Sequence, residues 1–161
     1  MAEKTNAIRI LEKKKIQFDV IAYNVDPEDL SATHVADSLG EPFDHVYKTL
    51  VLRGDKTGVF VCQIPAHKEI DLKKAAKISG NKKAEMILMK ELLPLTGYIR
   101  GGCTPIGMKK DYPVFISQNM AELSEVYISA GKRGLQIKLK PEDLKEVTRA
   151  TFCDLTKEDS N

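Results

Sequence analysis

The strongest constraint on the fold is a pair of apolar segments separated by a short polar turn. Residues 46–53 and 58–65 are rich in β-branched side chains, and Gly54-Asp55-Lys56-Thr57 joins them. Branched side chains favour extended backbone, and a short glycine-containing segment favours a tight reversal. The sequence therefore predicts an antiparallel hairpin.

Capping residues and apolar spacing predict the other elements. Helices are expected after Thr5, after Ser31, after Asp71, within 86–93 and from Pro141 onward. Further strands are expected over 16–25 and near 96–100, 114–117, 125–130, 134–139 and 151–155. Many short strands with few helices favour an α+β domain over a doubly wound one. We expect a curved, barrel-like mixed sheet surrounded by helices.

The length of the chain suits one domain. With 161 residues it can bury roughly 70% of its unfolded surface without disulfides. We find no internal repeat or linker, so we expect a single domain over 1–157 and a frayed tail over 158–161.

The composition says more about the cellular compartment of the protein than about its function. Hydrophobic residues make up 42% and charged residues 30%, which is ordinary for a globular protein. The first residues run directly into a charged segment, so we expect no secretory leader, and no apolar run reaches membrane-spanning length. Cys62, Cys103 and Cys153 are sparse and show no C-x-x-C pair, which favours a reducing compartment. We expect a cytoplasmic protein that does not contact a membrane.

Charge alone does not identify a ligand. The net charge of +2 is too small to indicate nucleic-acid binding, although basic clusters could form a phosphate-facing surface or a solvated exterior. The three histidines show no metal-ligand spacing, so we expect neither a metal site nor a cofactor. The basic clusters are Lys13–Lys15, Lys82–Lys83, Lys109–Lys110 and Lys132–Arg133.

Lys48 interrupts the apolar face of a predicted strand. With a period of two, it shares a face with Val46, Leu50 and Leu52. Lysine is seldom buried unless it is paired or functional. Either Lys48 lies near the strand end and extends its amine to water, or it serves a binding site.

A glycine-rich loop follows at 100–108. Gly101, Gly102 and Gly107, with Pro105, make a loop whose backbone can approach a ligand closely or can be a plain connection. Its glycine spacing fits neither a dinucleotide fingerprint nor a phosphate-binding P-loop. Cys103 lies within the loop, but no histidine is near it in sequence, which argues against a nucleophilic thiol.

Three motifs occur in one order along the chain. They are Val46-Tyr47-Lys48-Thr49-Leu50, then residues 101–110, then Ser129-Ala130-Gly131-Lys132-Arg133-Gly134-Leu135, which alone would be an ordinary basic hairpin. Together with Tyr23 and Asp26, this set resembles the YbaK family of Cys-tRNA(Pro) deacylases, within the wider group of prolyl-tRNA-editing domains. The resemblance covers nearly the full length.

The resemblance implies an enzyme that hydrolyses mischarged Cys-tRNA(Pro) in trans, beside prolyl-tRNA synthetase. Lys48 would bind the 3′ end of the tRNA, and the Gly101–Gly102 backbone would border the scissile ester. The substrate thiol would attack its own carbonyl carbon. The remaining expected substrate-binding residues are Tyr23, Thr49, Thr104, Pro105, Gly107, Ser129, Gly131 and Gly134. DNA is not an expected partner.

Two departures from the family pattern and two other readings remain. Gln136 stands where some members carry an aspartate, and Cys103-Thr104 replaces Ile-Ser. A related deacylase acting on Ala- or Ser-tRNA, or a module that binds aminoacyl-tRNA or a synthetase without hydrolysis, would fit the same residues.

Overall fold

In the computed structural model, which describes residues 4–158, helices begin at side chains that cap their first turn. Thr5 accepts from the Ile8 N–H at the start of α1 (Asn6–Lys13). Ser31 accepts from the His34 N–H before α2 (Ala32–Leu39). Asp71 accepts from two backbone N–H groups before α3 (Leu72–Ser79). These three predicted helix starts are confirmed, because each cap satisfies donors that the helix leaves unpaired.

The remaining helical segments are short. The helix α5 begins at Pro141 as predicted and covers Pro141–Thr148. The helix predicted over 86–93 is displaced toward the C-terminus, since Met86 ends a strand and α4 covers Leu92–Thr96. Three 3₁₀ segments complete the set: η1 (Phe43–His45), η2 (Met89–Glu91) and η3 (Gln118–Glu122).

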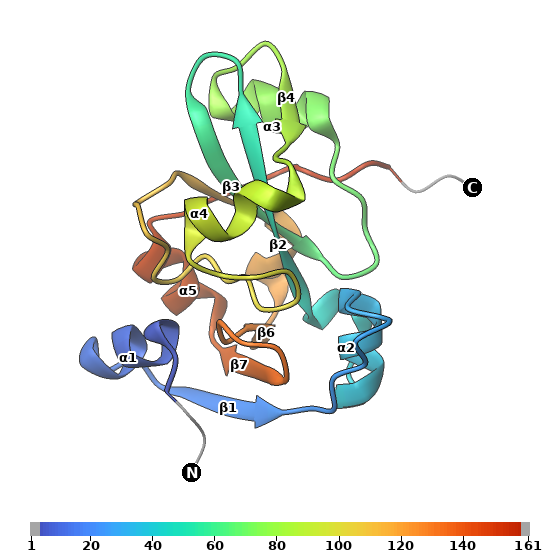
Figure 1. Cartoon of the computed structure of the whole chain (residues 1–161), viewed down its shortest axis with the longest axis vertical. Helices are drawn as coiled ribbons and strands as arrows, with labels where there is room; N and C mark the ends of the chain where they lie inside the picture. Colours follow the sequence, from blue (N-terminus) through green and yellow to red (C-terminus); the bar gives the residue numbers. More distant parts are fainter. Residues whose placement is uncertain (1–3, 159–161) are drawn as a thin grey trace.

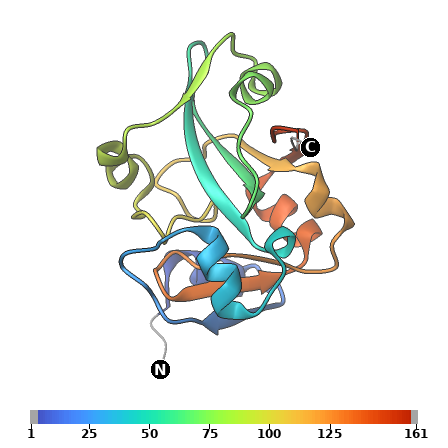
Figure 2. The same ribbon diagram turned by 90° about the vertical axis from the view of Figure 1, so that its right-hand side faces the viewer.

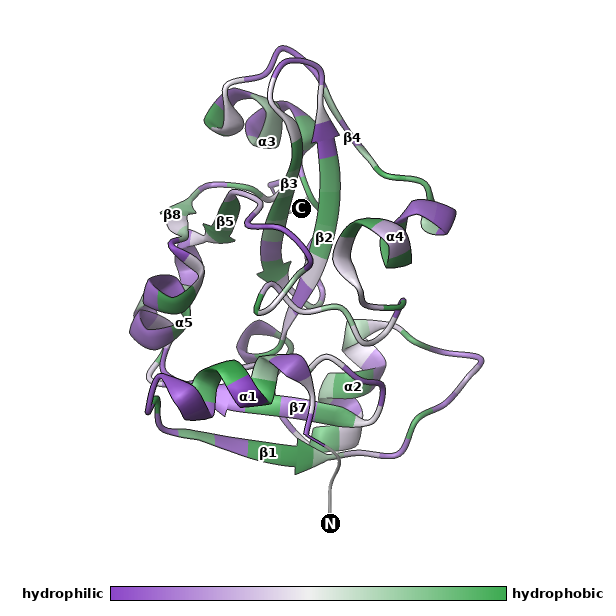
Figure 3. Ribbon diagram, turned by 60° about the vertical axis from the view of Figure 1, so that its left-hand side comes forward, coloured by the Kyte–Doolittle hydropathy of each residue, from purple (hydrophilic) through white to green (hydrophobic). Residues whose placement is uncertain are grey.

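The predicted hairpin is confirmed. Strands β2 (Tyr47–Gly54) and β3 (Gly58–Pro65) pair antiparallel, from Tyr47 opposite Pro65 to Gly54 opposite Gly58. In Figures 1 and 2 the hairpin runs from α2 at one end of the molecule to α3 at the other. Figure 3 shows that both strands are hydrophobic over much of their length, as expected for strands covered on both faces.

The strands divide between two sheets. One has the order β4-β2-β3-β5-β8, with β5 parallel to both neighbours, and the other is antiparallel with the order β1-β7-β6. A parallel bridge between Val46 and Tyr127 lies between them. The α+β class is confirmed, but the sheet is not closed into a barrel. The further strands are β1 (Phe18–Ala22), β4 (Ala84–Met86), β5 (Val114–Ser117), β6 (Val126–Ser129), β7 (Leu135–Leu139) and β8 (Thr151–Cys153).

The strand predicted near 96–100 is wrong. Thr96 ends α4, and its hydroxyl donates to the Leu92 carbonyl at 2.7 Å and accepts from the Tyr98 N–H at 3.0 Å. These local bonds turn the backbone and give its polar groups partners that a strand would have supplied. The glycine loop therefore follows a helix instead of a strand.

One core joins the two sheets. It includes Leu11 of α1, Val61 of β3, Ile137 of β7 and Leu144 of α5, all fully buried. No helix within 4–158 is long and apolar enough to span a membrane. Apart from Glu158, the frayed tail predicted over 158–161 lies outside the described residues.

Candidate functional site

A cavity of about 520 Å³ lies at the start of β2 and gathers residues from distant parts of the chain. Its walls come from α2, the segment after β3, the glycine loop and the ends of β6 and β7. The lining residues that matter for its chemistry are Lys48, Thr49, Gly101, Cys103, Ser129 and Gln136.

Lys48 lies in the wall of this cavity, together with Gly101. Its amine donates to the Ala66 carbonyl at 3.1 Å. Burial lowers the pKa of Lys48, and the nearby Glu69 carboxylate opposes that shift. The partly buried amine is thus a cation in the wall of the cavity that Gly101 also lines, where it can attract an anionic ligand.

Thr49 is oriented by a residue that the sequence analysis missed. Gln63 of β3 is fully buried directly opposite Thr49, and its Nε2 donates to the Thr49 Oγ1. Because the Thr49 oxygen accepts this bond, its own proton is available to a ligand in the cavity. A single amide within the apolar run Val59–Pro65 was the signal that could have identified Gln63.

Ser129 and Gln136 form a neutral polar pair in the cavity wall. They lie opposite each other on β6 and β7, and the Ser129 hydroxyl accepts from the Gly131 N–H at 3.2 Å. Gln136 is 4% exposed, and its Oε1 has no hydrogen-bond partner within 4–158. An unpaired buried acceptor is costly, so a ligand N–H or O–H that meets this oxygen would be favoured.

Gly101 and Gly102 play different structural roles. Gly101 lines the cavity with a φ of 84°, a left-handed conformation that favours glycine. Gly102 packs against the turn between β6 and β7, where an added Cβ would lie 3.1 Å from backbone atoms of Lys132 and Arg133. The Arg133 Nε also donates to the Arg100 carbonyl at 2.8 Å. The glycine loop and the turn between β6 and β7 are therefore in direct contact at the cavity rim.

The structure places the other predicted site residues outside this cavity. Tyr23 lines a small adjoining hollow that Gly101 also borders. Thr104 is fully buried, and its hydroxyl has no hydrogen-bond partner in the described range. Pro105 and Gly107 border a separate hollow beside α1, Gly131 packs on Tyr98 and Thr5, and Gly134 lies beside Val25 and the Tyr23 carbonyl.

Cys103 is poorly suited to act as a nucleophile. Its side chain borders the cavity, but burial raises the pKa of the thiol to about 12. The thiolate, which is the reactive form, is therefore scarce at neutral pH. Residues 4–158 contain no group of three or more His, Cys, Asp or Glu side chains that could hold a metal ion.

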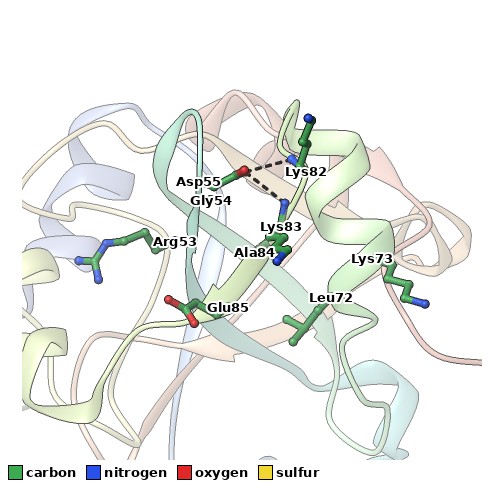
Figure 4. A pocket seen from close by; sticks show the side chains of 9 residues that line it. All are labelled: Arg53, Gly54, Asp55, Leu72, Lys73, Lys82, Lys83, Ala84 and Glu85. Atoms are coloured by element: carbon green, nitrogen blue, oxygen red, sulfur yellow. Dashed lines mark hydrogen bonds between the residues drawn. The ribbon is translucent and has the colours of Figure 1, made fainter.

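Two further hollows lie along the α3 side of the five-stranded sheet. One, of about 710 Å³, shares Lys48, Leu50 and Glu69 with the cavity. The other, of about 700 Å³, lies between α3, β4 and the hairpin turn and is shown in Figure 4. Both are larger than the cavity, but of the predicted site residues they contain only Lys48.

Comparison with known proteins identifies the family. The model of the aminoacyl-tRNA editing domain matches residues 26–147. The chain is also 47% identical over 154 residues to an Enterococcus faecalis protein, EbsC, named as a proposed Cys-tRNA(Pro)/Cys-tRNA(Cys) deacylase. That match covers 96% of this chain and 94% of the relative. The chain therefore belongs to the aminoacyl-tRNA editing domain family, as the motif resemblance predicted.

Two other matches extend the comparison. A proline–tRNA ligase of Cupriavidus necator is 25% identical over 134 residues, covering 81% of this chain and 23% of the ligase. A crystal structure described as a proposed trans-editing enzyme for prolyl tRNA synthetase has a TM-score of 0.83. It is 23% identical and covers 98% of this chain and 100% of its own, which supports the fold.

Proposed function

We propose that this protein hydrolyses the ester of a mischarged tRNA, and that Cys-tRNA(Pro) is its substrate. Family membership and the name of the E. faecalis relative support this proposal. The observation that carries it is the partly buried Lys48 amine in one cavity with the Gly101 backbone.

Lys48 binds the substrate in this proposal and does not act as a base. Its positive charge holds the 3′-terminal adenosine or a nearby phosphate, because a cation in a partly buried wall attracts an anion strongly. The Gly101 backbone borders the scissile ester, since this glycine lines the cavity and has no side chain of its own to occupy it. Thr49 and Ser129 supply hydroxyl groups to the same cavity, and Gln136 supplies an amide oxygen.

The chemistry is assisted by the substrate. The cysteinyl sulfur forms a bond to its own carbonyl carbon, the bond from that carbon to the ribose oxygen breaks, and the thiol proton passes to the departing oxygen. Water then opens the resulting thiolactone to free cysteine. This route needs no protein nucleophile, which agrees with the buried, protonated Cys103.

A separate editing enzyme serves a physical need. One methylene in a binding pocket changes discrimination by only about 1–3 kcal/mol, so a synthetase site for proline accepts some cysteine. We propose that prolyl-tRNA synthetase is the partner beside which this protein works. The similarity to part of a proline–tRNA ligase supports an editing role linked to that enzyme.

Replacing Lys48 tests the proposal. We expect Lys48→Ala to lower kcat/KM for Cys-tRNA(Pro) about 10- to 100-fold, because a hydrogen bond to a charged group contributes about 1.5–3 kcal/mol. Deacylation of Cys-, Ala- and Ser-tRNA(Pro) is measured with and without prolyl-tRNA synthetase. Lys13→Ala, on the exposed side of α1, is the control.

Each contrary result has a defined meaning. A Lys48→Ala variant as fast as the parent would remove Lys48 from the site. Faster turnover of Ala- or Ser-tRNA(Pro) would assign another substrate. Tight tRNA binding with no cleavage above the uncatalysed rate would make the protein a binding module.

A further inference from the structure

The cavity continues into a groove on the α3 side of the five-stranded sheet. The hollow beside the cavity shares Lys48 with it, and the hollow in Figure 4 shares Leu72 and Lys73 with that neighbour. We call these two joined hollows the basic groove. It leads from Lys48, past the first turn of α3, to β4 and the β2–β3 turn.

The floor of the basic groove is apolar. Alternation along β2 places Leu50 on the same face as Lys48, and Met86 of β4 pairs opposite Leu52 on that face. Leu72 and Met86 are 39% and 42% exposed, which is high for large apolar side chains. Flat apolar ligand groups can therefore lie along this floor and displace water from it.

The rim of the basic groove is positively charged. Lys73, Lys82 and Lys83 are exposed and form no ion pair with any residue in 4–158. All three line the hollow of Figure 4.

The acidic groups nearby are mostly occupied. Asp55 accepts from the backbone N–H groups of Lys82 and Lys83 at 3.0 and 3.1 Å, drawn as dashed lines in Figure 4. Glu69 pairs with Lys157 at 3.2 Å, and Asp71 caps α3. The Arg53 guanidinium is paired with Glu91 at 2.6 Å. Glu85 is exposed and also lines the hollow of Figure 4, so the three lysines share it with one further carboxylate. The charged side chains that line this hollow still carry a net positive charge.

We propose that the basic groove binds the single-stranded 3′ end of the tRNA as it leaves the cavity. This proposal rests on the proposed function, which places the aminoacyl ester beside Lys48. A single strand alternates apolar base faces with phosphates, and the groove pairs an apolar floor with a cationic rim. Continuity through Lys48 lets one strand occupy the cavity and the groove together.

Removing the rim charges tests this path. The variant Lys73→Ala/Lys82→Ala/Lys83→Ala removes three exposed side chains and leaves the backbone donors to Asp55 and Asp71 in place. Binding of uncharged tRNA(Pro) is measured by fluorescence anisotropy over a salt series. We expect weaker binding, with the slope of log affinity against log salt reduced by about 2, because each phosphate on a single strand contributes about 0.7.

A matched control removes the same charge elsewhere. Arg9→Ala/Lys13→Ala/Lys14→Ala strips three exposed cations from α1 and its C-cap, and α1 lies at the opposite end of the molecule from α3 and β4 in Figure 1. This variant is expected to keep the affinity and the salt slope of the parent. Cleavage of a 3′-cysteinyl-adenosine, which is too short to reach the groove, is expected to be equal in all three proteins.

The possible results distinguish a failure of the groove proposal from a failure of the proposed function. Equal tRNA affinity and salt slope in the groove variant and the parent would overturn the path, even if the parent deacylates tRNA. Normal tRNA binding with lost association to prolyl-tRNA synthetase would make the groove a protein-docking surface and would also overturn it. If the parent protein cleaves no aminoacyl ester but the parent and the variants show the expected salt slopes, only the deacylase proposal is contradicted.

Discussion

At the scale of single residues, Lys48 carries a positive charge in a partly buried position, and burial disfavours the charged form. Burial lowers its pKa in the folded chain, so between this lowered value and the ordinary one the unfolded chain binds more protons. The free energy of unfolding therefore rises with pH across that interval. The cost is largest at neutral pH, where Lys48 is fully charged in both states.

Lys48→Met is expected to raise the free energy of unfolding at pH 7 while it lowers deacylation. The gain should shrink as pH rises through the lowered pKa, because the parent then loses the buried charge as well. Urea unfolding of both proteins at several alkaline pH values measures the difference. A gap that widens with pH would contradict this account.

Cys103→Ala is expected to leave kcat within about threefold of the parent, because burial raises the pKa of the thiol to about 12. The free energy of unfolding should fall by about 1 kcal/mol, since a small buried side chain is lost. Steady-state kinetics and urea unfolding check both parts. A loss of turnover comparable with that of Lys48→Ala would restore Cys103 as a nucleophile.

The sequence predicted some site residues and could not find others. Lys48 stood out because a charge interrupted an apolar strand face, and the structure places it in a cavity with Gly101. Gln63 was missed although it is a single amide in an apolar run, and its role could not be predicted because the hairpin register pairs it with Thr49. Pro105 and Gly107 were assigned from motif proximity, but the loop turns them toward α1.

At the scale of elements, the glycine loop depends on its contact with the β6–β7 turn. Gly102 lies so close to the backbone of Lys132 and Arg133 that a methyl group would force one loop to move. Gly101, the residue before Gly102, lines the cavity. The contact between the two loops therefore sets the shape of the cavity wall at Gly101.

Gly102→Ala is expected to lower the free energy of unfolding by about 1–3 kcal/mol, because an added methyl overpacks a close backbone contact. It should also reduce deacylation, since the neighbouring Gly101 lines the cavity. Gly58→Ala in the hairpin turn is the control, because its Cβ meets nothing within 4 Å and only its φ of 81° is strained. Equal activity in the two variants would show that loop contact does not shape the site.

Local signals explain which elements were predictable. The helix starts at Ser31 and Asp71 were predictable because one side chain supplies each cap. The segment after α4 was not predictable in this way. The Thr96 hydroxyl bonds to the Leu92 carbonyl and the Tyr98 N–H, and so the helix ends in a turn. The division into two sheets depends on packing across the whole chain, which local patterns do not report.

At the scale of the whole molecule, both sheets share one core. Ile137 of β7 and Val61 of β3 belong to the same buried cluster, although their strands lie in different sheets. We therefore propose that residues 1–157 unfold as one cooperative unit.

Ile137→Ala is expected to lower the free energy of unfolding by about 2–5 kcal/mol, because it leaves a cavity in this shared core. Far-ultraviolet circular dichroism and tyrosine fluorescence should report the same midpoint in urea. Ile78→Ala is the control, because Ile78 is 42% exposed on α3. Two separated transitions would contradict a single unit.

The cavity draws its walls from six stretches of chain that begin near residue 30 and end at Gln136. No short peptide cut from this sequence contains all of these walls, so we expect the site to be transferable only with the fold that assembles it. Fusion or insertion of the intact unit is then the simple route by which a ligase could acquire such a site, and swapping whole domains is the practical way to transplant it.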